Sequence, residues 1–492
     1  MSKIIDLTVN EEGLKKNIEK AKENNIILPT LEQMKNPDSI PEKIKNKLEN
    51  IGLWDVNPLN LFRITWKNEQ KEHGGKFGKP NYIIMPPSIT GVKNNILLMT
   101  GKWFPTGCHK VGASFGCLAP RLITGQFDTT YHKAVWPSTG NYCRGGAFNS
   151  KLLACESVAI LPEDMSKERF EWLKSIAGEI IATPGCESNV KEIFDKTWEL
   201  KNDPQYMIFN QFEEMGNYMW HYNVTGNAIA EAFEDFSKGT KKLAGAVFTS
   251  GSAGTMASGD RLKDLYPTMK LGVGEALQCP TILDNGFGGH RIEGIGDKHI
   301  PWIHNVKNTD MVVAIDDEDS QRLLRLFNDP VGHKYLKSQG VSDEVINNLS
   351  YFGISGIANL LCAIKMSKYY ELTENDVVAT VMTDSAVMYG SRIEELNAMY
   401  GEYKEVDAAV DWHSHILDLR TDTMEEFTYL TRKRVHNLKY YTWVEQQARD
   451  TEDLNDLWYD VDNTWKAAAN TAKEVDELIN EFNERTGLLK NL

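Results

Sequence analysis

Long apolar runs are absent from this sequence. No stretch approaches the roughly 20 residues that a bilayer-spanning helix needs, and the first six residues, Met1 to Asp6, lack the apolar core of a signal peptide. A net charge of −15 opposes binding to nucleic acid and to anionic membrane surfaces. We therefore expect a cytoplasmic protein with neither nucleic acid nor a membrane as its partner.

Cysteine is scarce, and its positions show no pattern. The seven residues are odd in number and contain no C-x-x-C pair, which argues against a disulfide framework and a thiolate zinc site. The eleven histidines show no H-E-x-x-H spacing, so we predict no metal site. Free cysteine is usually buried, and we expect this of Cys108 and Cys143. The cysteines are Cys108, Cys117, Cys143, Cys155, Cys186, Cys279 and Cys362.

What the chain does contain is an alternation of β-like runs and amphipathic, helix-like stretches. With 492 residues and 41% hydrophobic residues, it can bury a large core. The alternation predicts an α/β protein with mostly parallel sheets covered by helices. The predicted strands are Lys133 to Trp136, Val158 to Leu161, Ile180 to Thr183, Ala244 to Thr249 and Val377 to Met382.

A turn-prone segment places one lysine at the start of a predicted helix. The segment Phe104 to Phe115 follows the apolar run Ile96 to Thr100 and carries Lys110. In a water-poor pocket a lysine amine loses its proton more readily and can form an imine with an aldehyde cofactor. The alternative for the isolated segment is a solvated lysine in the first turn of a helix.

Gly251 to Thr255 form a candidate phosphate-binding loop between a predicted strand and a helix that begins near Met256. Gly251 and Gly254 allow close approach of an anion, and the helix start offers unpaired N–H groups. The loop lacks the lysine of a nucleotide-binding P-loop and the G-x-G-x-x-G spacing of a dinucleotide site. A small phosphorylated cofactor fits better than a nucleotide, although a plain turn is an equal alternative for the isolated loop.

Two further segments share this form, in which an apolar run stops at small polar residues before a helix-like stretch. They run from Trp136 to Ala147 and from Val377 to Ser385. Ligands of open α/β sheets bind at this edge.

In this order the motifs resemble those of the pyridoxal-phosphate enzymes of the tryptophan synthase β-type fold (fold type II), nearest to cysteine synthase and cystathionine β-synthase. The resemblance covers about residues 95–400. Further matching segments are Leu161 to Ser166, Lys174 to Ile180, Asn210 to Phe212, Thr225-Gly226, Gly289 to Gly296 and Ile300-Pro301.

The resemblance implies pyridoxal 5′-phosphate as cofactor and a role for each matching residue. Lys110 would bind the cofactor as an imine and then move the Cα proton of the substrate. Asn141 would hydrogen-bond the phenolic oxygen of the ring, and Ser385 would face the pyridine nitrogen. The substrate carboxylate would be bound by Ser138, Thr139 and Gly140, with help from Gln211. The phosphate would be held by Gly251, Ser252, Ala253, Gly254 and Thr255.

Ser385 bears on the type of reaction. A hydroxyl does not keep the ring nitrogen protonated as a carboxylate does, so loss of a group from Cβ is favoured over transamination. Asp384 and Ser385 could also simply cap a helix that begins near Ala386.

The sequence departs from the cysteine synthase pattern at two places. Val111 and Gly112 stand where an aspartate and an arginine usually follow the lysine, and the pair His109-Lys110 looks instead like that of the tryptophan synthase β subunit. After Asn141, bulky residues replace small ones, among them Arg144. We weigh pairing of Arg144 with an acidic substrate group against an outward, solvated arginine, and favour the second.

The resemblance also implies a domain organisation. We expect an N-terminal extension (1–90), a large cofactor-binding domain (91–115 and 236–400), a small mobile domain (116–235) that closes over the substrate, and a helical C-terminal extension (401–492). Charged, helix-leaning stretches run from Glu11 to Asn24 and from Ser39 to Asn50. We expect a homodimer. The C-terminal extension could cover the site rim, form a dimer contact or bind a partner subunit.

The expected activity is β-replacement or β-elimination on a serine- or cysteine-type amino acid through an aminoacrylate intermediate, with a thiol or other nucleophile as the possible second substrate. Three alternatives remain: an ammonia-lyase or dehydratase, a desulfhydrase without a second nucleophile, and a cofactor-holding partner subunit without turnover. The residues named above are common to the enzyme readings, so the sequence leaves them open.

Overall fold

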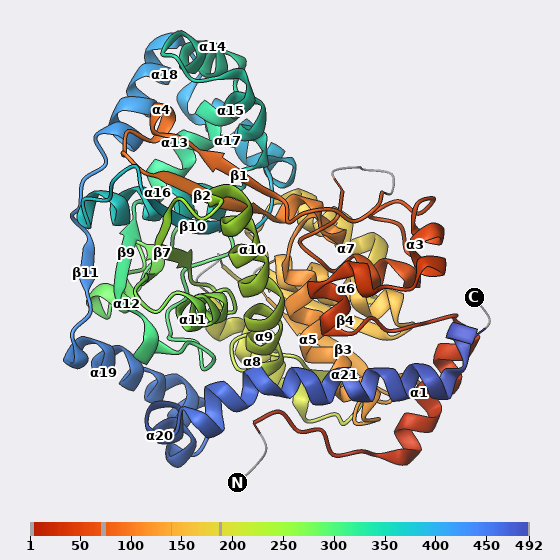
Figure 1. Cartoon of the computed structure of the whole chain (residues 1–492). Coiled ribbons are helices and arrows are strands. Elements are labelled where there is room, and N and C mark those ends of the chain that lie inside the picture. Colours follow the sequence, from red (N-terminus) through yellow and green to blue (C-terminus); the bar gives the residue numbers. More distant parts are fainter. Residues whose placement is uncertain (1–3, 70–74, 139, 186–188, 491–492) are drawn as a thin grey trace.

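The computed structural model describes residues 4–69, 75–138, 140–185 and 189–490. Two mostly parallel sheets form the centre of the protein, and helices cover them (Figure 1). This confirms the predicted α/β fold, and each of the five predicted strands is present within one or two residues of its expected bounds. No helix in the described ranges has the length and apolar character that crossing a bilayer would require.

The larger sheet has seven strands in the order β1-β2-β10-β7-β8-β9-β11. Its central strands pair in parallel, and the two edge strands pair antiparallel to their neighbours. The strands are β1 (Tyr82–Met85), β2 (Asn95–Thr100), β7 (Lys242–Thr249), β8 (Lys270–Ala276), β9 (Met311–Ile315), β10 (Asp376–Met382) and β11 (Met424–Glu426).

Alternate residues of the large sheet pack into two different cores, so both of its faces are buried. On β2, Leu97 and Met99 belong to one apolar cluster, while Ile96 and Leu98 belong to another. The second cluster includes nine residues of α16 (Ile354–Tyr369), a helix that is buried on all sides from Ile354 to Ser367. Such two-sided burial is typical of parallel sheets.

The smaller sheet has four parallel strands in the order β5-β4-β3-β6. Helix α6 (Asn141–Leu152) packs on β3 and β4, and α5 (Lys110–Ile123) packs on α6 and on α9 (Met215–Trp220). The strands are β3 (Lys133–Pro137), β4 (Glu156–Pro162), β5 (Glu179–Thr183) and β6 (Tyr206–Ile208).

The remaining elements are helices. Those up to α10 are α1 (Glu11–Glu23), α2 (Leu31–Lys35), α3 (Glu42–Leu48), α4 (Pro87–Thr90), α5 (Lys110–Ile123), α6 (Asn141–Leu152), α7 (Lys167–Ile176), α8 (Val190–Lys201), α9 (Met215–Trp220) and α10 (Gly226–Ser237). They continue with α11 (Met256–Leu265), α12 (Thr281–Asp284), α13 (Asp317–Asn328), α14 (Pro330–Ser338), α15 (Asp343–Asn348), α17 (Gly390–Tyr400), α18 (Glu405–Trp412), α19 (Tyr429–Asn437), α20 (Thr451–Tyr459) and α21 (Ala467–Thr486).

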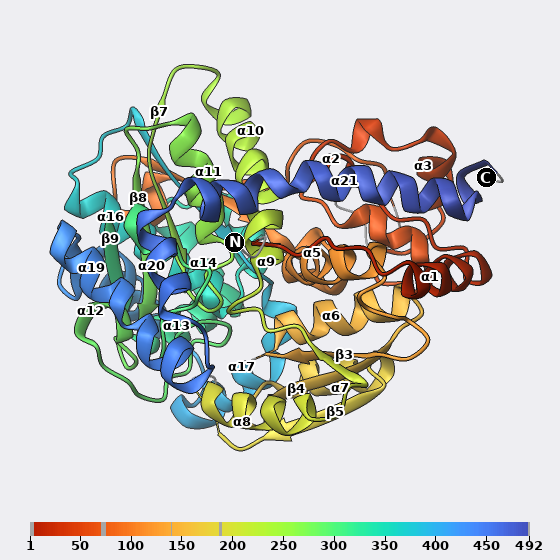
Figure 2. The same ribbon diagram turned by 90° about the horizontal axis from the view of Figure 1, so that it is seen from below.

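The N- and C-terminal regions pack against each other. Figures 1 and 2 both show α21 running alongside α1, although the two helices lie at opposite ends of the chain. The side chain of Asn483 donates to the carbonyl of Leu28 and accepts from its N–H, and Asp476 accepts from the N–H groups of Leu31 and Glu32 at the start of α2.

The region after residue 400 is mostly helical, as predicted, but it also contains one short strand. Met424 to Glu426, at the start of a stretch with helical apolar spacing, form β11 because the open edge of β9 accepts an antiparallel partner there. In the same way β1, within the expected N-terminal extension, pairs with β2. The domain boundaries at residues 90, 115, 235 and 400 stay a prediction.

Candidate active site

Lys110 is the first residue of α5, as predicted, and lies beside Gln211. The turn before it contains Thr106 and Gly107 in left-handed backbone conformations, with φ of 68° and 66°. Lys110 Nζ donates to Gln211 Oε1 at 3.0 Å. Because Gln211 follows β6 of the small sheet while Lys110 follows β2 of the large one, this bond joins the two halves of the protein.

The predicted phosphate loop lies between β7 and α11, and the cavity it lines also contains Lys110. None of the N–H groups of residues 251–255 donates a hydrogen bond to any residue that the structure describes. A Cβ on Gly254 would lie 2.2 Å from Asn217 Oδ1, so only glycine fits at that position. Free donors at a helix N-terminus suit an anion, so the donor set fits the phosphate of pyridoxal phosphate.

The predicted substrate loop connects β3 to α6. Ser138 is buried, and its Oγ accepts from the N–H of Gly140 at 3.0 Å. Gly140 has a φ of 145°, which favours glycine at this position. Thr139 lies outside the described residues. Asn141 begins α6 and donates through Nδ2 to Asp384 Oδ2 at 2.7 Å.

Ser385 is buried and directly follows Asp384, so it lies close to Asn141 in the fold. It occupies the cap position of a short 3-10 helix, Ala386–Tyr389, but its side chain makes no capping hydrogen bond. The structure therefore brings Asp384 to Asn141, and it brings Lys110, Gln211 and the phosphate loop together. The role of Ser385 at a pyridine nitrogen stays a prediction.

Two histidines complete the wall of the cavity around the phosphate loop. His109 and His221 pack edge to face with ring centroids 5.2 Å apart. Burial lowers the pKa of His109 to about 3 and that of His221 well below its ordinary value, so both imidazoles are neutral. The sequence analysis did not identify His221 as a site residue. The only feature that could have indicated it is its position one helical turn before the matching segment Thr225-Gly226.

The prediction of an outward, solvated Arg144 was wrong. Its side chain is completely buried and lies over the rings of Trp54 and Trp172, 5.7 and 4.8 Å from their centroids. One guanidinium nitrogen donates to the carbonyl of Thr106 at 3.0 Å. Burial and the charge of Arg169 lower the pKa of Arg144 to about 10, which leaves it charged at neutral pH. Arg144 thus supports the turn that precedes Lys110.

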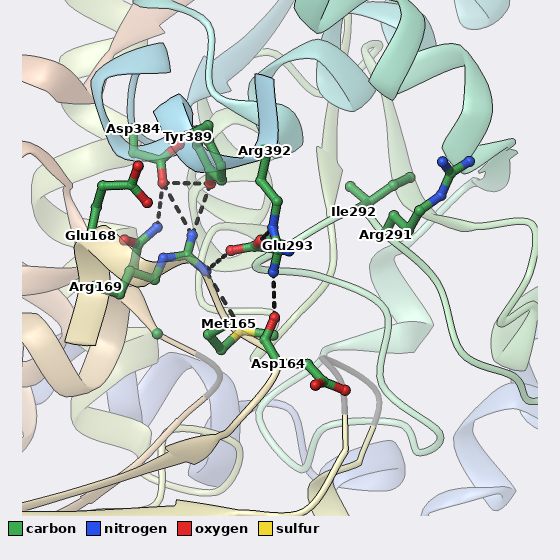
Figure 3. A network of polar contacts seen from close by, with 12 residues as sticks. Asp164, Met165, Glu168, Arg169, Arg291, Ile292, Glu293, Asp384, Tyr389 and Arg392 are labelled. Carbon is green, nitrogen blue, oxygen red and sulfur yellow. Dashed lines mark hydrogen bonds and ion pairs between the residues drawn. The ribbon is translucent and has the colours of Figure 1, made fainter. Parts of the chain in front are cut away.

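A second buried arginine, which sequence reasoning missed, connects the two halves through a polar network (Figure 3). Arg169 of α7 donates to Glu293 Oε2 at 2.5 Å and to Tyr389 Oη at 2.8 Å, and lies 3.6 Å from Asp384 Oδ2. Its only sequence signal is that it shares the buried face of α7 with Leu173, four residues later.

The same network has a more exposed side. Arg392 donates to Glu293 Oε1 at 2.6 Å and also to the carbonyl of Asp164, while Glu168 accepts from the N–H and the hydroxyl of Ser391. Asp164 lies between β4 and α7 and Glu168 in the first turn of α7, both on the side of the small sheet, whereas Arg392 and Ser391 lie in α17. Together with Arg169 these contacts hold the two halves in one arrangement around Asn141 and Lys110.

Cys108 and Cys143 are buried, as predicted, and burial raises the pKa of each thiol to about 12. They pack inside the motifs as neutral thiols. Cys186 lies outside the described residues.

No family model matches the chain, but curated proteins do. A probable cysteine synthase of Bacillus subtilis is 31% identical over 193 residues, which cover 39% of this chain and 61% of the relative. A cysteine synthase of Staphylococcus aureus is 28% identical over 256 residues, 52% of this chain and 74% of the relative. The cystathionine beta-synthase of Saccharomyces cerevisiae is 25% identical over 312 residues, 62% of this chain and 58% of the relative.

Solved structures agree on the fold. The O-acetylserine dependent cystathionine beta-synthase of Helicobacter pylori superposes with a TM-score of 0.53 at 23% identity, covering 64% of this chain and 95% of that one. A hydrogen sulfide-producing enzyme of Fusobacterium nucleatum gives a TM-score of 0.53 at 22% identity, covering 63% and 95%. The chain is thus similar in sequence to cysteine synthases and cystathionine beta-synthases, and it shares the fold of these solved enzymes. The match spans 61% of the length of the Bacillus subtilis relative.

Replacing Arg144 tests its place in the site. Because the side chain is enclosed and holds the Thr106 turn, Arg144→Met should lower turnover of acidic and neutral substrates by a similar factor, about 10- to 100-fold. The measurement is kcat/KM for O-phospho-L-serine and O-acetyl-L-serine in both proteins. A loss confined to the phosphorylated substrate would mean instead that Arg144 pairs with an acidic substrate group.

Removing the buried cation at position 169 tests the network between the two halves. Arg169→Met removes the cation beside the buried carboxylate of Asp384 and leaves Glu293 with Arg392 as its ion-pair partner, and it should lower the free energy of unfolding by about 3–5 kcal/mol. The matched control is Arg291→Met, since Arg291 also pairs with two carboxylates but is 42% exposed and should cost about 1 kcal/mol or less. Equal urea midpoints for the two variants would contradict the role given to Arg169.

Proposed function

We propose that this chain is a pyridoxal-phosphate-dependent enzyme that replaces or eliminates the β-substituent of a cysteine- or serine-type amino acid. The observation that carries the proposal is a single cavity lined by the amine of Lys110 and the free N–H groups of residues 251–255. When bound there, pyridoxal phosphate supplies an aldehyde for amino groups and a conjugated ring that withdraws electrons from Cα.

Different residues of the chain would bind the cofactor, bind the substrate and transfer the proton. Lys110 holds the cofactor and then moves the proton of the substrate Cα, while the loop Gly251 to Thr255 and the start of α11 hold the phosphate. Ser138, Thr139, Gly140 and Gln211 bind the substrate carboxylate. Asn141 orients the ring through its phenolic oxygen, and Ser385 faces the ring nitrogen.

The relatives support this class of chemistry. They include cysteine synthases and cystathionine beta-synthases. A related hydrogen sulfide-producing enzyme is known in complex with an α-aminoacrylate intermediate. In this class the replacing nucleophile is a thiol or a similar group. A homodimer and a cytoplasmic location stay predictions for this chain.

A substrate screen distinguishes the reactions. The purified protein, loaded with pyridoxal phosphate, is mixed with L-cysteine, L-serine and O-acetyl-L-serine, with and without an added thiol, while products and visible absorbance are followed. We expect turnover of at least one of them. Pyruvate formed without thiol indicates elimination, whereas a new amino acid formed only with thiol indicates replacement.

The control for this screen is Lys110→Ala, which should abolish product formation because the Cα proton loses its acceptor. No product from any of these amino acids in the presence of bound cofactor would contradict the proposal and indicate a cofactor-holding subunit without turnover.

A further inference from the structure

Asp297 is a buried carboxylate that its surroundings leave unsatisfied. The residue is 6% exposed, and its Oδ2 accepts no hydrogen bond within the part of the chain that the structure describes. Its position is nevertheless defined, because the hydroxyl of Thr281 donates to its backbone carbonyl at 2.9 Å. Burying a carboxylate without donors is costly, so such a group needs an explanation.

The segment that carries Asp297 forms one wall of the candidate active site. The N–H of Gly296 donates to the carbonyl of Ser250, directly before the phosphate loop, at 2.9 Å. Two residues after Asp297, the ring of His299 packs 4.8 Å from the ring of Phe212, which follows Gln211. The segment 296–299 therefore runs from the phosphate loop to the neighbourhood of Gln211, and Asp297 within it is close enough for the charge of Lys110 to act on its carboxyl.

The charges around Asp297 suit a group that exchanges protons. Burial raises the pKa of Asp297 to about 7, and the positive charge of Lys110 opposes this rise. Among the described residues, the other titratable group coupled to it is the Cys279 thiol, itself buried with a raised pKa. Neutral and ionised forms of Asp297 are thus both accessible near neutral pH, and the neutral form prevails as the pH falls.

β-Substitution needs two proton transfers, and Lys110 accounts for only one of them. The amine takes the proton from Cα, and the electron pair of that bond forms a double bond to Cβ as the bond from Cβ to its substituent breaks. A thiolate or hydroxide is a poor leaving group unless it receives a proton as it departs. Acetate and chloride, in contrast, are good leaving groups and depart from Cβ without receiving a proton.

On the basis of the function proposed above, we propose that Asp297 is the general acid and base at the β-substituent. Its carboxyl proton passes to the departing sulfur or oxygen as the bond to Cβ breaks, which yields the neutral thiol or water and leaves Asp297 ionised. The carboxylate then takes the proton of the incoming nucleophile as the new bond to Cβ forms. A proton donor at this position narrows the substrate class of the proposed function. The site would favour cysteine or serine, whose β-substituent leaves only with a proton, over amino acids that carry a good leaving group.

The decisive comparison is Asp297→Asn on two substrates that differ in the leaving group. With the loaded enzyme, release of sulfide from L-cysteine should fall about 100-fold or more. Release of chloride from β-chloro-L-alanine, which needs no proton, should fall less than about tenfold. Asp284→Asn, at an exposed aspartate at the end of α12, is the matched control and should leave both rates unchanged.

A second measurement does not depend on turnover. Infrared difference spectra of the protein without cofactor should show a neutral carboxyl band that titrates near pH 7 and is missing from Asp297→Asn. A wild-type protein without this band would overturn the proposal, since Asp297 would then have no proton to give at neutral pH.

The remaining outcomes separate the two proposals. Equal losses on both substrates would show that Asp297 only supports the site, and no loss on cysteine would show that it takes no part; either result overturns the assignment while the proposed function stands. If the wild-type enzyme releases nothing from either substrate, the proposed function itself fails and the assignment falls with it.

Discussion

The contact between Lys110 Nζ and Gln211 Oε1 connects the two sheets at the point where the chemistry is proposed to occur. Lys110 comes from the turn after β2 and Gln211 from the segment after β6, so their separation depends on how the two halves pack. A reactive amine must be held within hydrogen-bonding distance of the atoms on which it acts. The remaining contacts of the site can be understood as means of keeping this geometry.

Buried charges hold that geometry from two sides. Arg144 lies between two tryptophans and supports the strained Thr106 turn before Lys110. Arg169 reaches from the side of the small sheet to Glu293 and to the neighbourhood of Asp384, which in turn binds Asn141. A buried ion pair adds little net stability, but removing one partner leaves an uncompensated buried charge, which is costly. Such pairs therefore act mainly by destabilising arrangements of the two halves in which the pair is broken. The network thus favours the arrangement in which the two halves meet around the site.

Asp297 differs from these charges because none of the residues that the structure describes donates a hydrogen bond to its carboxylate. Asp384 is also buried, and its Oδ1 likewise accepts no hydrogen bond among the described residues, but its Oδ2 accepts from Asn141 and Tyr389. A buried carboxylate that lies near a lysine amine, with no hydrogen-bond donor among the described residues, is positioned to change its protonation state rather than to fix a structure. This contrast is the reason for assigning chemistry to Asp297 and structure to Asp384.

The sequence carried enough information to locate the strands and the loops at their carboxyl ends, because these depend on local patterns of apolar and small residues. Lys110 and the loop Gly251 to Thr255 could be found in this way, and the structure places them in one cavity. The surroundings of Arg144, Arg169 and Asp297 could not be predicted in this way, since each environment is formed by residues far away in the sequence. A charged side chain is by default expected to face solvent. Arg144 is buried instead, because Trp54 and Trp172 pack against its guanidinium.

The edge strands escaped prediction for a similar reason. Met424 to Glu426 have no strong β pattern of their own, and they become β11 only because β9 offers an unpaired edge. Local sequence determines an element reliably when the element buries its own apolar face. A three-residue strand depends on its neighbour instead.

The central claim is that the amine at position 110 carries the cofactor, and reductive labelling tests it most directly. The protein is incubated with pyridoxal phosphate, reduced with borohydride, digested and analysed by mass spectrometry. The account predicts a single pyridoxyl label on the peptide that contains Lys110. A label on another lysine, or no label after saturation with the cofactor, would contradict it.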